Sequence, residues 1–123
     1  MIAGIGIDAV QISRMEKWAN NTVLLERFFD NREILVIRDR GKDMIRSLAS
    51  HFAAKEAFGK ALGTGIMGLT LKDIMILSRK NERPILHVEG SALEAMKISG
   101  ANKVHVSLTH DGDLALAFVV LEV

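Results

Sequence analysis

The chain has 123 residues, of which 49% are hydrophobic and 25% are charged, and it contains no cysteine. This length and composition are typical of one compact globular domain, which we expect to span residues 1–123. The lack of cysteine excludes disulfides, thiolate metal sites and cysteine nucleophiles, which is compatible with a cytoplasmic location. A net charge of +1 gives no broad field for nucleic acid, so an acidic partner has to meet a local basic patch.

The first apolar stretch, residues 2–10, alternates with a period of two and predicts a strand. Gly4, Gly6 and Asp8 share one face of this strand, so a carboxylate follows two glycines. The stretch is far too short to span a bilayer before charged residues begin, and we therefore predict no association with a membrane.

Helical patterns follow, and they predict helices over residues 13–20, 30–40 and 43–62. Ser13 would be the N-cap of the first helix, because Glu16 follows it at the spacing of a capping box. Gly41 would end the second helix and Gly63 the third, since glycine tolerates the left-handed conformation found just after helices.

The second half of the chain mixes strands with one helix. It predicts a loop over residues 63–68, strands over 73–79 and 85–89 around a turn at 81–84, a helix over 91–98, and a hairpin of strands 103–110 and 114–123. Asp-Gly-Asp between the last two strands favours a tight turn. The whole pattern predicts an α+β fold, with a mainly antiparallel sheet packed against the long central helix.

Three charged residues of the long helix, Lys55, Glu56 and Lys60, stand among apolar residues, which predicts a crevice where charge has a function. A surface pair of Glu56 with Lys60 is an equally good interpretation, since pairs at this spacing are common on helices. Combined with Asp8, however, Glu56 would supply two hard oxygen ligands from different elements. Such a pair suits Mg²⁺ that also takes oxygen ligands from water and phosphate.

Two other segments could contact a ligand. The strand before the hairpin turn places His105, Ser107 and Thr109 on one face and brings His110 near the turn. No nucleophile elbow accompanies Ser107, so a row of polar groups on the sheet surface is favoured over a hydrolase triad. The glycine-rich loop after Lys60 either ends the helix or lets backbone approach a phosphate.

In chain order, the segments GIGIDAVQISR, SLASHFAAKEAFGKALGTGI and VHVSLTH resemble the holo-acyl-carrier-protein synthase family of 4′-phosphopantetheinyl transferases. The resemblance covers nearly the whole chain. It implies the fold of that family and transfer of phosphopantetheine from coenzyme A to a serine of apo-acyl carrier protein, in support of fatty acid biosynthesis. The other product would be adenosine 3′,5′-bisphosphate, Mg²⁺ would be required, and the enzyme would be a cytoplasmic homotrimer with active sites between subunits.

The resemblance also implies roles for individual residues. Asp8 and Glu56 would bind Mg²⁺, and with Lys60, which would steady the pyrophosphate, they would form the catalytic set. The residues expected to contact coenzyme A are Lys55, Lys60, Gly63, Gly65, Pro84, Ser107, Thr109 and His110. One departure is that Glu82 and Arg83 precede the proline, where relatives commonly have Gly-Lys.

The carrier protein is acidic, and basic residues of the first helices would dock it, namely Arg14, Lys17 and Arg27. Trp18, Phe28 and Phe29 would add apolar contacts or belong to the core. The base for the attacking serine would be Glu56 acting through a metal-bound water, or Glu33. Two other functions stay open: a Mg²⁺-dependent phosphohydrolase, and a non-catalytic module that binds nucleotides or RNA.

Overall fold

A computed structural model describes residues 1–78 and 81–123 of the chain. The end of the strand that the sequence predicts over residues 73–79 lies outside this described part. Among the described helices, none combines the length and the apolar character needed to cross a bilayer.

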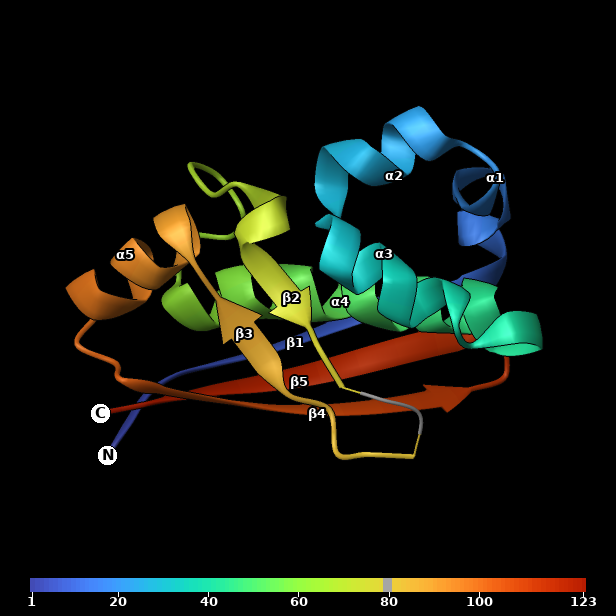
Figure 1. The fold of residues 1–123 in the computed structure, drawn as a ribbon. Helices are drawn as coiled ribbons and strands as arrows, with labels where there is room; N and C mark the ends of the chain where they lie inside the picture. Colours follow the sequence, from blue (N-terminus) through green and yellow to red (C-terminus); the bar gives the residue numbers. More distant parts are fainter. Residues whose placement is uncertain (79–80) are drawn as a thin grey trace.

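The larger sheet has three strands, β1 (Ile2–Gln11), β4 (Lys103–Asp111) and β5 (Leu114–Glu122). Their order is β1-β5-β4 and both pairings are antiparallel, so β5 lies between the other two. The predicted hairpin of β4 and β5 is confirmed. The backbone N–H of Val123 donates to the carbonyl of Met1 at 2.8 Å, which brings the two ends of the chain together (Figure 1).

The long helix α4 (Met44–Leu62) packs along one face of this sheet, mainly on β1 and β5 (Figure 1). Ala57 and Ala61 of α4 lie directly against Gly6 and Gly4 of β1, so small residues let helix and strand approach closely. Gly63 ends the helix with a φ of +86°, as the sequence predicts. The predicted α+β fold with an antiparallel sheet against a long helix is therefore confirmed.

Short helices connect β1 to α4 and gather at one end of the molecule (Figure 1): η1 (Ile12–Met15), α1 (Glu16–Ala19), α2 (Thr22–Phe28), α3 (Asn31–Arg38) and η2 (Gly41–Asp43). The sequence did not predict α2. Asp30 caps α3 by accepting a hydrogen bond from the backbone N–H of Arg32. Gly41 lies beyond the end of α3, at the start of η2, so it does not end α3 directly.

The predicted capping box at Ser13 is wrong. Ser13 lies inside η1, and both its backbone N–H and its hydroxyl donate to the carboxylate of Asp113, at 3.0 and 2.7 Å. Asp113 belongs to the turn between β4 and β5, which is 100 residues away in the sequence. A distant acceptor has therefore replaced the local one that the spacing to Glu16 suggested.

The remaining elements form a smaller layer beside α4. The strands β2 (Ile74–Ile76) and β3 (Leu86–Val88) pair antiparallel, η3 (Leu71–Asp73) precedes β2, and α5 (Gly90–Ile98) follows β3. Both strands are shorter than predicted, and α5 matches the predicted helix closely. The β2–β3 pair contacts α4 through β2 and β4 through β3, so it closes the gap between them.

The face of the three-stranded sheet that is turned away from α4 carries exposed apolar side chains on β1 and β5. Ile5 and Ile7 of β1 are 59% and 58% exposed, and Phe118 of β5 is 41% exposed. Ile7 pairs with Phe118, so these side chains are neighbours on the same face.

Candidate active site

The candidate site forms where β1 lies directly against α4. A Cβ atom added to Gly4 would lie 1.9 Å from the carbonyl oxygen of Ala61, and one added to Gly6 would lie 2.0 Å from that of Ala57. Neither distance leaves room for a side chain. The two glycines therefore let the strand backbone touch the helix, and Asp8, next on the same face, meets the charged side chains of α4.

Asp8 and Lys60 form the closest contact of the site. The Nζ atom of Lys60 donates to Asp8 Oδ1 at 2.9 Å and to the carbonyl oxygen of Ile7 at 3.1 Å. The Asp8 side chain is 17% exposed and that of Lys60 is 52% exposed. The carboxylate is therefore mostly covered, whereas the lysine side chain is open to solvent. The carboxylate of Asp8 raises the pKa of Lys60 through this hydrogen bond and through its charge.

Glu56 lies one helical turn before Lys60 and is half-buried. Burial raises the pKa of its carboxyl group, the negative charge of Asp8 raises it further, and Lys60 lowers it. The influence of Asp8 on Glu56 means that the two carboxylates lie close enough to interact electrostatically. The structure thus brings Asp8, Glu56 and Lys60 together.

This arrangement fits a hard divalent cation. The two carboxylates supply oxygen donors, and the ammonium of Lys60 already marks a position where positive charge is stabilised. Among residues 1–78 and 81–123, no group of three or more His, Cys, Asp or Glu side chains is suitably placed to bind a metal ion. A cation here would therefore need further oxygen ligands from water or substrate, as Mg²⁺ commonly has.

Lys55 does not join this site, although it directly precedes Glu56. Its side chain is 1% exposed, and Nζ donates to Glu33 Oε1 at 2.7 Å, to the Leu71 carbonyl at 2.9 Å and to the Ile74 carbonyl. All three donors of the ammonium are therefore used inside the protein. The structure thus gives no support to the predicted contact of Lys55 with coenzyme A. Burial lowers the pKa of Lys55, and the charge of Glu33 opposes that shift.

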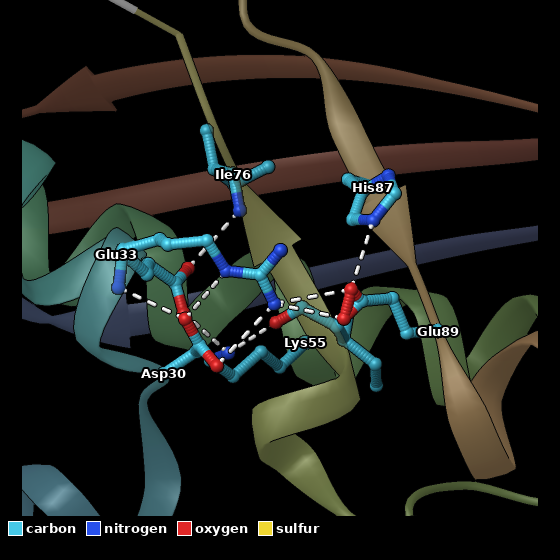
Figure 2. Close-up of polar contacts among 8 residues, drawn as sticks. Asp30, Glu33, Lys55, Ile76, His87 and Glu89 are labelled. Carbon is cyan, nitrogen blue, oxygen red and sulfur yellow. Dashed lines mark hydrogen bonds and ion pairs between the residues drawn. The ribbon is translucent and has the colours of Figure 1, made fainter.

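Glu33, one of the two predicted bases, belongs to the same interior cluster (Figure 2). Its carboxylate is 0% exposed and also accepts a hydrogen bond from the backbone N–H of Ile76, while Nδ1 of His51 lies 2.8 Å from Oε2. A carboxylate with so many partners and no exposure cannot reach the serine of another protein. Figure 2 also shows the exposed ion pairs of Asp30 and Glu89 with Arg32 beside this cluster.

The predicted ligand contacts of β4 lie elsewhere on the sheet. Ser107 pairs with Phe118 and Thr109 pairs with Leu116, so both point to the face turned away from α4, opposite to Asp8. His110 pairs with the buried Ala115 on the side of the helix, but β5 separates it from β1. One chain therefore does not bring these residues to the carboxylates.

Two cavities lie along β4, and Pro84 lines both. The first, of about 400 Å³, is also lined by His105 and Ser107. Two of the predicted coenzyme A contacts, Pro84 and Ser107, therefore lie in the same cavity. The second, of about 280 Å³, is lined by basic and hydroxyl side chains that the sequence analysis did not single out, including Arg40, Arg46, Ser47, Ser50 and His51. Arg46, Ser47, Ser50 and His51 lie on one polar face of α4, and this face is the sequence feature that could have indicated the cavity.

The predicted glycine contacts follow directly after Lys60. Gly63 donates its backbone N–H to the Lys60 carbonyl at 3.0 Å, and Gly65 donates to the Gly59 carbonyl at 3.0 Å. The loop therefore folds back on the last turn of α4, close to the part of the helix that carries Lys60.

The proposed docking residues Arg14, Lys17 and Arg27 are all exposed. They lie on η1, α1 and α2, and of these η1 and α1 pack against α4. The aromatic residues divide between two environments. Phe29 is fully buried in the core, whereas Trp18 is half-buried and contacts the rings of Phe28 and Phe52, with centroids 5.5 and 5.3 Å apart.

Comparison with known proteins adds a family to this geometry. A family model described as the 4′-phosphopantetheinyl transferase superfamily matches residues 4–119. A holo-[acyl-carrier-protein] synthase of Treponema denticola is 50% identical over 122 residues, covering 99% of both chains.

Solved structures agree with the sequence matches. The holo-[acyl-carrier-protein] synthase of Neisseria meningitidis has a TM-score of 0.87 at 34% identity, covering 99% of both chains. That of Helicobacter pylori, solved in complex with coenzyme A, has a TM-score of 0.80 at 35% identity, covering 96% of this chain and 99% of that chain. The chain therefore belongs to the 4′-phosphopantetheinyl transferase superfamily, within its holo-[acyl-carrier-protein] synthase family.

Proposed function

We propose that this chain transfers the 4′-phosphopantetheine group of coenzyme A to a serine of apo-acyl carrier protein and so supports fatty acid biosynthesis. The observation that carries the proposal is the convergence of Asp8, Glu56 and Lys60 at the contact of β1 with α4, in a chain of this family. The serine oxygen attacks the phosphorus that bears pantetheine. The bond to the other phosphate breaks, and adenosine 3′,5′-bisphosphate leaves.

Transfer of a phosphoryl group depends mostly on positioning and on neutralising charge, and the site supplies the groups for both. Asp8 and Glu56 would hold Mg²⁺, which would offset the negative charge of the pyrophosphate. Lys60, half-exposed beside them, would bind a pyrophosphate oxygen with its ammonium group. Gly63 and Gly65 follow Lys60 closely and would form backbone contacts with the same ligand.

Glu56 is the preferred base for the proton of the attacking serine. It is half-buried at the site and reaches solvent, whereas Glu33 is enclosed by Lys55, His51 and Ile76. We propose that Glu56 accepts this proton through a bridging water, which is compatible with its position beside Asp8.

The adenosine end of coenzyme A would bind along β4. Pro84 and Ser107 line one cavity there, and the adjacent cavity with Arg46 and His51 offers cationic and polar groups suited to a phosphate. Thr109 and His110 lie on the same strand and would complete the contacts. Glu82 and Arg83 precede Pro84 in this chain, so the outline of the adenosine site would differ from that of relatives with glycine there.

Active sites formed between subunits would combine the carboxylate site with the adenosine site along β4. Ser107 and Thr109 lie on the opposite face of the sheet from Asp8, and the same face carries the exposed side chains of Ile5, Ile7 and Phe118. Burying the apolar side chains of this face against another copy is favourable, and a site formed between subunits would let β4 of one subunit act together with the carboxylates of another. We propose a homotrimer, as the resemblance to the family implies.

The acidic carrier protein would dock on the exposed cations Arg14, Lys17 and Arg27. The packing of η1 and α1 against α4, with Trp18 on Phe52 one turn before Glu56, supports docking next to the reacting groups. We propose that the enzyme acts in the cytoplasm.

The direct test combines the protein with apo-acyl carrier protein, coenzyme A and Mg²⁺. We expect mass spectrometry to show the carrier protein heavier by one phosphopantetheinyl group, with an equal amount of adenosine 3′,5′-bisphosphate released. Samples with EDTA, and samples without carrier protein, serve as controls. Nucleotide release without carrier protein would instead indicate the phosphohydrolase, and no adduct with several carrier proteins would remove the proposal.

A further inference from the structure

Lys60 makes two contacts with β1, not one. Its ammonium group donates both to the Asp8 carboxylate, at 2.9 Å, and to the Ile7 carbonyl oxygen, at 3.1 Å. Oxygen atoms of these two kinds are also the usual ligands of hard divalent cations. The side chain therefore occupies the kind of position that a cation bound by Asp8 would take.

The charges of the site make this overlap important. Asp8 carries one negative charge, and Lys60 already neutralises it at hydrogen-bond distance. A divalent cation beside the same carboxylate would be repelled by an ammonium group held within a few ångströms. Because the Lys60 side chain is 52% exposed, it has free space into which its ammonium group can move.

We propose that Lys60 is an internal counter-cation of Asp8 that competes with the divalent metal ion. Metal binding then displaces the ammonium group from Asp8, and the displaced group becomes available to the pyrophosphate of coenzyme A. This inference rests on the metal assignment of the proposed function and adds a second role for Lys60. It has an unusual consequence: removal of the lysine strengthens metal binding while it weakens transfer.

The test measures metal binding directly, without turnover. Mn²⁺ is titrated into the full-length protein in the absence of coenzyme A, and free Mn²⁺ is measured by electron paramagnetic resonance. The variants are Lys60→Met and Lys60→Gln, with Lys97→Met, an exposed lysine of α5, as the matched control. Circular dichroism and thermal unfolding verify that each variant is folded.

We expect both Lys60 variants to bind Mn²⁺ about tenfold more tightly than the parent protein, because a repelling charge close to the ion is removed. Lys97→Met should bind as the parent does. Equal or weaker binding by the folded Lys60 variants, or no Mn²⁺ binding by any form, would overturn the inference.

An Asp8→Asn variant distinguishes this failure from failure of the proposed function. If Asp8→Asn loses Mn²⁺ binding while Lys60→Met shows no gain, the metal site stands and only the competition is refuted. If Asp8→Asn binds Mn²⁺ as well as the parent, the metal assignment fails and the inference falls with it.

Discussion

The ammonium group of Lys55 lies 2.7 Å from the carboxylate of Glu33, and both side chains are excluded from solvent. This buried ion pair joins α3 to α4, and the backbone carbonyls of Leu71 in η3 and Ile74 in β2 accept hydrogen bonds from the same ammonium group. Lys55 is therefore part of the protein interior, whereas the neighbouring Glu56 lies at the candidate site.

Replacing Lys55 with methionine should reduce stability strongly, because it leaves the Glu33 carboxylate buried with fewer partners. We expect a loss of about 3–5 kcal/mol in the free energy of unfolding, measured by urea denaturation. Arg32→Gln, which breaks only exposed ion pairs, is the control and should have a much smaller effect. A stable Lys55→Met protein with a raised KM for coenzyme A would instead favour a direct ligand contact.

Substitution of Gly6 by alanine should separate β1 from α4. The added Cβ would overlap the Ala57 carbonyl, so we expect a loss of about 3 kcal/mol in stability and a clear loss of transfer. Glu94→Gln, on an exposed position of α5, should leave stability unchanged within about 0.5 kcal/mol. Chemical denaturation and the transfer assay measure the two effects, and a fully stable Gly6→Ala protein would contradict the close contact.

Asp8→Asn and Glu56→Gln should each reduce kcat/KM by at least about 100-fold, because each removes a charged oxygen ligand from the proposed metal site. The fold should persist, since neither side chain is fully buried. Initial rates are measured over a range of Mg²⁺ concentrations, with Asp39→Asn on an exposed position as the control. Parental activity in either variant would refute its assignment.

Mixing two inactive variants tests whether sites form between subunits. One carries Asp8→Asn, and the other carries both Thr109→Val and His110→Ala. If a site uses Asp8 of one subunit and β4 of its neighbour, mixed trimers should recover about a quarter of the parental activity. Sedimentation analysis establishes the oligomeric state. No recovery after verified subunit exchange would place both sets of residues in the same subunit.

The capping carboxylate of Asp30 predicts a dependence of stability on pH. Arg32 holds the pKa of Asp30 below its ordinary value of 3.8 through hydrogen bonds from its side chain and backbone. Since the folded pKa is the lower one, this stabilisation is complete above the ordinary value and is lost as the pH falls through the folded value. Asp30→Asn keeps the cap and should therefore reduce the decrease in Tm below about pH 4. Parallel Tm profiles for the two proteins would contradict this.

Local patterns predicted much of the fold. The period of two in residues 2–10, the glycine at position 63 and the Asp-Gly-Asp turn each specify one structure through nearby residues alone, and each prediction is confirmed. The Ser13 capping box failed because its hydroxyl found Asp113, an acceptor that only the tertiary fold supplies.

The same distinction applies to the site. Lys55 and Glu56 are adjacent in the sequence, but successive residues of a helix point about 100° apart. Neighbours along the chain can therefore belong to the core and to the surface. No local sequence pattern predicts that Glu33, 22 residues earlier, is the partner of Lys55.

The alternation of β1 gives the strand two distinct sides, with Gly4, Gly6 and Asp8 toward the helix and Ile5 and Ile7 away from it. Deleting Ile7 would reverse the sides for the remainder of the strand. Asp8 would then point away from α4. The spacing of these residues is thus constrained as tightly as their identities.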